Sequence, residues 1–93
     1  MINKYNYYFA TENKKQLKKI LSLCIDIFGG YTLFNTFGGW QDENKIKHIE
    51  KAYKLTILTE KEKEVKPLAK YINYKCNQQT TIIETQNKIN FIN

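Results

Sequence analysis

The residues that could take part in chemistry are concentrated in one short stretch of the sequence. Asp42, Glu43 and Glu50 supply carboxylates, and His48 is the only histidine of the chain. Such groups act as general acids or bases, and a carboxylate can also hold a cationic ligand. Carboxylates at a polar hairpin are equally ordinary solvated charges, and a lone histidine is usually a surface residue. The function of this stretch therefore depends on what surrounds it.

Common catalytic and binding motifs are absent from the sequence. It contains no nucleophile elbow, no phosphate-binding glycine loop and no zinc-ligand spacing. Cys24 and Cys76 are the only cysteines, and with one histidine they cannot complete a four-ligand zinc site without carboxylates. Their helical spacing predicts small buried thiols, with a reactive thiol as the alternative. We therefore expect no cofactor and no metal ion.

The net charge of +6 restricts the kinds of partner, because every basic residue is lysine. A basic surface attracts phosphates, nucleic acids or acidic partners, although lysines can equally reflect an AT-rich genome. Lysine lacks the bidentate grip of arginine on guanine, which argues against sequence-specific DNA recognition. The seven tyrosines and five phenylalanines can stack on bases, but in strands they belong more often to a core or an interface. Non-specific nucleic-acid binding stays an open alternative.

Length and hydropathy indicate one small domain over residues 1–93. No apolar run approaches the roughly 20 residues that cross a bilayer, so we expect no membrane association. The N-terminus has no basic segment followed by an apolar one, which predicts no secretory signal and a cytoplasmic location. A chain this short buries about 60–65% of its unfolded surface, and subunit association is a common remedy.

Sequence periodicity predicts a strand and then a helix in the first third of the chain. Aromatic residues at every second position predict a strand over residues 4–9. Thr11 is a suitable helix cap, and Glu12 would be favourable in the first turn. Gly29 and Gly30 would end this helix. Its apolar stripe, at three- and four-residue spacing, is Leu17, Ile20, Leu21, Cys24, Ile25 and Phe28.

A hairpin is predicted next. Residues 31–37 and about 48–58 read as two strands, and the polar segment 40–45 reads as the hairpin tip. Gly38 and Gly39 interrupt the first of these strands, which suggests a bulge or a close backbone approach.

A second helix and a final strand complete the predicted elements. Residues 59–62 match a capping box, and the helix core stripe is Val65, Leu68, Ala69, Ile72 and Cys76. Pro67 lies inside this pattern, so either the first turn is separate and the main helix starts near Lys66, or the helix is kinked. Residues 81–85 form the last core strand, and residues 88–92 form a short extra strand, in this sheet or with a neighbouring subunit.

The order β-α-β-β-α-β with short connections predicts an α+β, ferredoxin-like fold. It has one antiparallel sheet with both helices on one face. The other face would carry tyrosine and phenylalanine side chains from several strands. Such an apolar face seldom stays in water, so we expect a homo-oligomer.

Between Gly29 and Glu84 the order of short segments resembles a known family. The segments are Gly-Gly-Tyr-Thr-Leu from Gly29, Phe-Gly-Gly-Trp-Gln-Asp from Phe37, Glu-Lys-Ala-Tyr from Glu50 and Gln-Thr-Thr-Ile-Ile from Gln79. This succession resembles small phage proteins of the S-adenosylmethionine lyase family. It is also similar to related short phage and bacterial proteins of ferredoxin-like fold.

The resemblance implies a trimer with active sites between subunits. The lyases cleave S-adenosylmethionine without water, giving methylthioadenosine and homoserine lactone. Such an enzyme needs a folded substrate pose and a carboxylate near the sulfonium. By this resemblance, Glu50 would be catalytic if the protein is a lyase, and Trp40 would hold the sulfonium by cation–π attraction. The resemblance places further ligand contacts at Gln41, Tyr31 and Tyr53.

The chain is shorter than the lyases at its C-terminus and lacks a clear match to a second acidic position. Ligand binding is therefore better supported than catalysis, and a lysine-rich surface suits an anionic nucleotide better than cationic S-adenosylmethionine. We expect a phage-type, homo-oligomeric protein with a counter-defence role. It would hold an adenosine-containing or other nucleotide metabolite between subunits, and whether it cleaves that ligand stays open. The alternative is a counter-defence inhibitor that binds a host protein through its basic surface.

Overall fold

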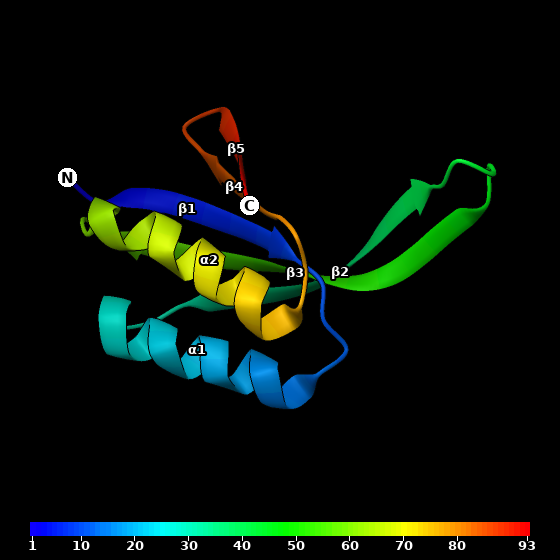
Figure 1. Ribbon diagram of the computed structural model, residues 1–93. Coiled ribbons are helices and arrows are strands. Elements are labelled where there is room, and N and C mark those ends of the chain that lie inside the picture. The colour runs from blue at the N-terminus through cyan, green and yellow to red at the C-terminus, as the bar shows by residue number, and fades with distance from the viewer.

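Five strands and two α-helices build the protein, as a computed structural model covering residues 1–93 shows (Figure 1). In chain order they are β1 (Asn3–Phe9), α1 (Lys14–Phe28), β2 (Thr32–Gln41), β3 (Lys47–Thr59), α2 (Val65–Cys76), β4 (Thr81–Thr85) and β5 (Lys88–Ile92). A short 3₁₀ turn, Glu62–Glu64, precedes α2. Neither helix is long and apolar enough to cross a membrane.

All five strands belong to one antiparallel sheet, in the order β2-β3-β1-β4-β5. Figure 1 shows both helices on the same side of this sheet. The first four strands and the helices form the predicted ferredoxin-like α+β arrangement. The extra strand β5 pairs with β4 of the same chain, and so needs no neighbouring subunit.

The core lies between the helices and the sheet, and the predicted stripes supply most of it. Strand alternation buries Tyr5, Tyr7 and Phe9, while the helices add Ile20, Cys24, Val65, Leu68, Ala69 and Ile72. The Tyr7 hydroxyl donates to the backbone carbonyl of Val65 at 2.9 Å, so the polar atom of this fully buried side chain is satisfied. Burial raises the pKa of the Cys24 thiol to about 12, which favours the predicted inert thiol.

The start of α1 differs from the prediction. Asn13 caps the helix instead of Thr11, because its Oδ1 accepts from the backbone N–H groups of Lys15 and Gln16 at 3.0 and 3.2 Å. Thr11 instead accepts from the N–H of Asn13. Glu12 therefore precedes the first turn. Thr and Asn are both good caps, and local pattern alone does not choose between them. The other end is as predicted, with Gly29 in the left-handed conformation at φ 84°.

The start of α2 also differs from the prediction. Residues 59–62 form no capping box: Thr59 accepts from the N–H of Lys61 at 2.9 Å, and the 3₁₀ turn follows. Pro67 is the third residue of α2, where the missing N–H has no intrahelical acceptor. The alternative of a separate first turn is thus confirmed. Ile25, assigned to the stripe of α1, is exposed.

The predicted bulge in β2 is wrong. β2 and β3 pair without a skipped residue over the whole length of β2. Gly38 and Gly39 have no positive φ. A Cβ on Gly38 would lie 3.9 Å from the Cβ of Ala52, and one on Gly39 would lie 3.7 Å from the carbonyl oxygen of His48, both ordinary contacts. The fold of a single chain therefore does not require glycine at either position.

The far half of the β2–β3 hairpin, residues 37–51, extends beyond the helices as a two-stranded ribbon that we call the arm (Figure 1). Its turn is shorter than the predicted tip of residues 40–45, because Trp40 and Gln41 still pair with β3. In the turn, Asp42 Oδ1 accepts from the N–H groups of Asn44 and Ile46 at 2.9 and 3.0 Å. Large apolar side chains of the arm are uncovered, with Phe37 72% and Ile49 80% exposed.

The helix-free face of the sheet carries the expected apolar side chains around a polar centre. Phe34, Leu58, Ile89 and Phe91 are exposed there. At the centre, Glu84 accepts from the Tyr8 hydroxyl at 2.7 Å and from the Asn6 amide at 3.1 Å. These bonds hold the pKa of the Glu84 carboxyl below its ordinary value, the Tyr8 bond contributing most. This face is not closed by any element of the chain.

Candidate functional site

One face of the arm gathers Trp40 and Glu50, two of the residues singled out in the sequence. The β2–β3 register pairs Trp40 with His48 and Gly38 with Glu50. Residues two apart on a strand share a face, so all four lie on one face of the arm. We call the space around Gly38, bounded by Trp40, His48 and Glu50, the notch. Because Gly38 has no side chain, the notch is open above its backbone.

The wall of the notch is fixed by contacts at the hairpin tip. The Trp40 and His48 rings stack with centroids 4.3 Å apart and planes 15° apart. His48 Nε2 lies 2.9 Å from Asp42 Oδ2, and the backbone of Ile46 bonds the other oxygen. The hydrogen bond from His48, followed by that from Ile46, holds the pKa of the Asp42 carboxyl below its ordinary value. The turn thus orients the aromatic rings.

Glu50 faces the notch without a partner, because the structure gives its carboxylate neither a hydrogen bond nor an ion pair. A free carboxylate beside an aromatic ring is suited to a cation, which the carboxylate attracts by charge and the ring by its quadrupole. The notch therefore has the chemistry that a sulfonium or an ammonium group needs.

On the opposite side, the base of the arm and α1 enclose a groove of about 620 Å³, which we call the lysine groove. Its cations are Lys14 and Lys18, one helical turn apart on α1, and Lys51 on β3. No carboxylate lines it. The remaining lining residues are Leu17, Leu21, Leu33, Asn35, Thr36, Phe37, Ala52 and Tyr53.

The lysine groove combines an apolar floor with a cationic border. The Tyr53 ring is buried and packs against Phe9 with centroids 5.7 Å apart, so this part of the floor is rigid. The volume falls within the range of about 300–1,000 Å³ for small-molecule sites. An adjoining hollow of about 430 Å³ shares Lys14, Phe37, Lys51 and Tyr53 and is bordered by Glu50. The groove is thus suited to an anion that carries an aromatic group.

The residues assigned by resemblance occupy four places in one chain. Trp40 and Glu50 lie on the same face of the arm, at the notch, whereas Tyr53 lies in the lysine groove. Gln41 pairs with Lys47 at the end of the arm, on the face opposite Trp40. Tyr31 precedes β2 and lies nine strand positions from Trp40, about 30 Å at 3.3 Å per residue. One chain therefore does not assemble these five residues into one site.

The lysines of the groove were not singled out in the sequence. Lys14 and Lys18 flank the apolar stripe of α1 in the sequence. The four-residue spacing of Lys14 and Lys18 beside Leu17 and Leu21 was the available signal. That spacing does not show that the base of the arm lies next to this helix.

Comparison with known proteins shows likeness in structure alone. No protein-family model matches the sequence, and neither does any curated protein. A phage S-adenosylmethionine lyase in complex with S-methyl-5'-thioadenosine is 15% identical, has a TM-score of 0.67 and matches over 97% of this chain and 88% of its own. The apo state of a phage S-adenosylmethionine lyase is 12% identical, with a TM-score of 0.73 over 97% of this chain and 87% of that chain.

Two further solved structures share the arrangement. The periplasmic divalent cation tolerance protein CutA from Archaeoglobus fulgidus is 11% identical, with a TM-score of 0.66 over 91% of this chain and 81% of its own. The B. subtilis GlnK–ATP complex is 16% identical, with a TM-score of 0.58 over 90% and 81% of the two chains. At these identities the likeness shows the fold. The predicted similarity to phage S-adenosylmethionine lyases is confirmed at that level.

Proposed function

We propose that the protein is a homo-oligomeric binding protein for an adenosine-containing or other anionic nucleotide. The observation that carries the proposal is the lysine groove, where three lysines and two aromatic rings border about 620 Å³ without a carboxylate. Support also comes from two proteins of the same fold, one solved with S-methyl-5'-thioadenosine and one with ATP.

The groove offers separate surfaces for the two parts of a nucleotide. Phe37, which is 72% exposed, presents aromatic surface to a base, which stacks on such a ring irrespective of its identity, and the buried Tyr53 ring forms part of the floor. Lys14 and Lys18 approach from α1 and Lys51 from β3, so a phosphate group between them meets cations from two sides. Lysine acts on phosphate as a point charge, which suits phosphates of varied geometry.

The uncovered surfaces support association of several copies. The helix-free face exposes Phe34, Leu58, Ile89 and Phe91, and the arm exposes Phe37 and Ile49. These apolar side chains flank the polar centre of the face, and exposed apolar surface of this extent on a small protein is a candidate interaction site. Light scattering during size exclusion measures the mass directly, and a monomer at micromolar concentration would contradict the oligomeric part of the proposal.

Sequestration of the nucleotide is the form of the proposal that the geometry favours over cleavage. A lyase needs the Glu50 carboxylate and the adenosine site to act on one molecule of S-adenosylmethionine. In one chain Glu50 faces the notch, on the face of the arm opposite the lysine groove, and only borders the hollow beside that groove. Removal of a nucleotide from solution, as in a counter-defence role, requires the groove alone.

Charge reversal on α1 tests the groove, with a matched control on the same helix. Lys14 and Lys18 line the groove, whereas Lys15 and Lys19 do not. In calorimetric titration with ATP, Lys14→Glu with Lys18→Glu is expected to weaken binding about 10- to 100-fold. Lys15→Glu with Lys19→Glu changes the net charge equally and is expected to stay within about threefold. Equal losses in the two double variants would show non-specific attraction and refute a groove site.

Ligand identity and turnover are tested together by chromatography of the ultrafiltrate, before and after heat denaturation. The panel contains S-adenosylmethionine, methylthioadenosine, ATP and signalling nucleotides. A compound that disappears and returns intact on heating identifies a sequestering protein. Methylthioadenosine formed by the wild type and not by Glu50→Gln would identify a lyase. An unchanged panel would favour the alternative, an inhibitor that binds a host protein.

A further inference from the structure

The excess positive charge of the protein is gathered on one layer of the fold, the two helices. α1 and α2 together carry seven of the fifteen lysines and only one carboxylate, Asp26. The other eight lysines are balanced by the other eight of the nine carboxylates. The whole net charge of +6 therefore resides on the helices, which an even enrichment of the sequence in lysine does not explain.

Packing brings most of the helical lysines together at one end of this layer. The N–H of Ala10, before α1, donates to Gln78 Oε1, after α2, at 3.3 Å. At the other end, Lys61 Nζ donates to the carbonyl of Ile27 at 2.7 Å, so the helices run antiparallel (Figure 1). The lysines of α1 all lie within its first six residues, and Lys75 lies in the last turn of α2. The surface that we call the basic face consists of Lys14, Lys15, Lys18, Lys19, Lys70 and Lys75.

No lysine of the basic face is neutralised within the chain. The two ion pairs of the structure lie elsewhere, and neither involves a lysine. Five of the six lysines are exposed. Lys75 is half-buried, with its Nζ 5.5 and 5.4 Å from the ring centroids of Tyr71 and Tyr74. The charge of this face is thus left for an anion from outside the chain.

The lysines of α1 occupy the end of the helix where they stabilise it least. The N-terminal end of a helix carries partial positive charge and favours acidic side chains, whereas the C-terminal end favours basic ones. α1 has no acidic residue in its first turn and no basic residue in its last, where Asp26 lies instead. Folding alone would favour the reverse arrangement. The observed distribution is the one expected if this end of the helix layer meets an external anion.

We propose that the basic face binds the phosphate backbone of double-stranded nucleic acid without regard to sequence. Lysine is depleted in protein–protein interfaces, whereas interfaces with nucleic acid are strongly positive. Tyr74 is the only exposed aromatic ring on the helices, and single strands are held mainly by stacking on several rings. Binding in a membrane surface requires a broad apolar helix face, which both helices bury in the core. Lysine without arginine suits contacts to phosphate rather than to bases.

The basic face is compatible with the proposed oligomer and separable from the nucleotide site. The helices lie on the opposite side of the sheet from the helix-free face, so association through that face leaves the lysines open (Figure 1). Lys14 and Lys18 also line the lysine groove, whereas the other four lysines of the basic face do not. Variants of Lys15 and Lys19 therefore test duplex binding while the groove stays intact.

Fluorescence anisotropy with labelled DNA duplexes of about 20 base pairs and two unrelated sequences tests the proposal. Both duplexes are expected to bind with equal affinity. Lys15→Gln with Lys19→Gln is expected to weaken binding at least tenfold at ~50 mM salt, and to reduce the slope of log K against log salt by about two. Lys15→Arg with Lys19→Arg keeps the charge and is expected to keep the affinity. The matched control, Lys47→Gln with Lys88→Gln, removes two exposed lysines outside the helices and is expected to stay within about twofold.

Four outcomes would overturn the proposal, and circular dichroism confirms that each variant is folded. The first is a wild type that does not bind the duplexes. The second is an equal loss in the control variant, which would show attraction by net charge alone. The third is a single strand of the same length that binds as tightly as the duplex. The fourth is displacement of the duplex by polyglutamate at equal charge concentration, which would indicate an acidic protein as the partner. Phosphatidylserine vesicles that bind while the duplex does not would assign the face to a membrane.

Calorimetric titration with ATP separates this proposal from the proposed function. Lys15→Gln with Lys19→Gln is expected to lose duplex binding and to keep ATP binding. A wild type that binds the duplex and not ATP would leave the basic face in place and refute the nucleotide groove. A wild type that binds ATP and not the duplex would refute the basic face and leave the groove in place.

Discussion

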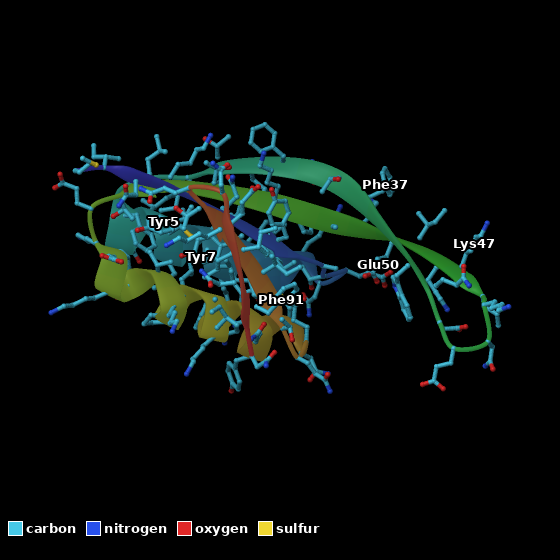
Figure 2. The ribbon with its side chains drawn as sticks, turned by 90° about the horizontal axis from the view of Figure 1, so that it is seen from above. Tyr5, Tyr7, Phe37, Lys47, Glu50 and Phe91 are labelled. Carbon is cyan, nitrogen blue, oxygen red and sulfur yellow. The ribbon has the colours of Figure 1, made fainter.

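The lysine groove and the notch lie on opposite faces of the same two strands and have opposite chemistry. The groove takes Phe37, Lys51 and Tyr53 from the arm and its base, whereas the notch takes Trp40 and Glu50. Figure 2 shows Phe37 and Glu50 on different sides of the ribbon. Because side chains alternate along a strand, two surfaces of opposite charge arise from neighbouring residues. An anion is expected to bind in the groove and a cation in the notch.

The two surfaces differ also in how firmly they are built. Tyr53 of the groove belongs to the hydrophobic core, and it is 8% exposed. Trp40 of the notch is 53% exposed and stacks on His48 of its own hairpin. The groove is therefore shaped by the folding of the whole domain. The notch is shaped by one turn and one aromatic stack.

The largest expected effect is a difference in protein stability between the Tyr53→Ala and Trp40→Ala variants. Tyr53→Ala removes a buried ring and its contact with Phe9, and is expected to lower the free energy of unfolding by about 3–4 kcal/mol. Trp40→Ala removes an exposed ring and is expected to cost less than about 1 kcal/mol. Urea titration followed by circular dichroism measures both. Equal losses would mean that the arm is as much part of the core as the groove floor.

The elements follow from sequence periodicity because their patterns are local. The period-two aromatic residues of β1 and the stripe of α2 each bury one face as predicted. Element boundaries were less predictable where two residues compete for one role. Thr11 and Asn13 are both suitable N-cap residues for α1, and only the backbone geometry at the start of the helix selects Asn13. Gly38 and Gly39 suggested a bulge, but a regular ladder accepts glycine as well.

The candidate site was predictable only in part, because it depends on register and on packing between distant elements. Once the hairpin register is known, alternation alone puts Trp40 and Glu50 on one face. The groove additionally requires that the base of the arm pass beside α1. The spacing of Lys14 and Lys18 does not predict that the base of the arm lies beside α1. The predicted roles of Trp40, Glu50 and the other residues assigned by resemblance stay predictions.

A smaller effect tests the sign of the charge at the border between the two surfaces. Glu50 borders the hollow next to the lysine groove, together with Lys14 and Lys51. Glu50→Gln removes a negative charge near the bound phosphates, and is expected to tighten ATP binding about two- to threefold at low salt. Calorimetric titration at two ionic strengths measures it, and the gain should shrink as salt rises. Weaker ATP binding would show that Glu50 contacts the nucleotide.

The smallest expected effect concerns the hairpin tip, where the pKa of the Asp42 carboxyl is lowered by its bonds from His48 and Ile46. Because the pKa is lowered in the folded state, the ionised carboxylate contributes its full stabilisation of the tip at pH values above 3.8, its ordinary pKa. That contribution is lost as the pH falls from 3.8 through the lowered pKa. Trp40 is the only tryptophan and stacks on His48, so its fluorescence reports the tip alone. The wild type is expected to show a fluorescence transition below pH 3.8 that Asp42→Asn lacks. If Asp42→Asn shows the same transition, a group other than Asp42 controls the stacking of Trp40 on His48. The turn would then not orient the rings that border the notch.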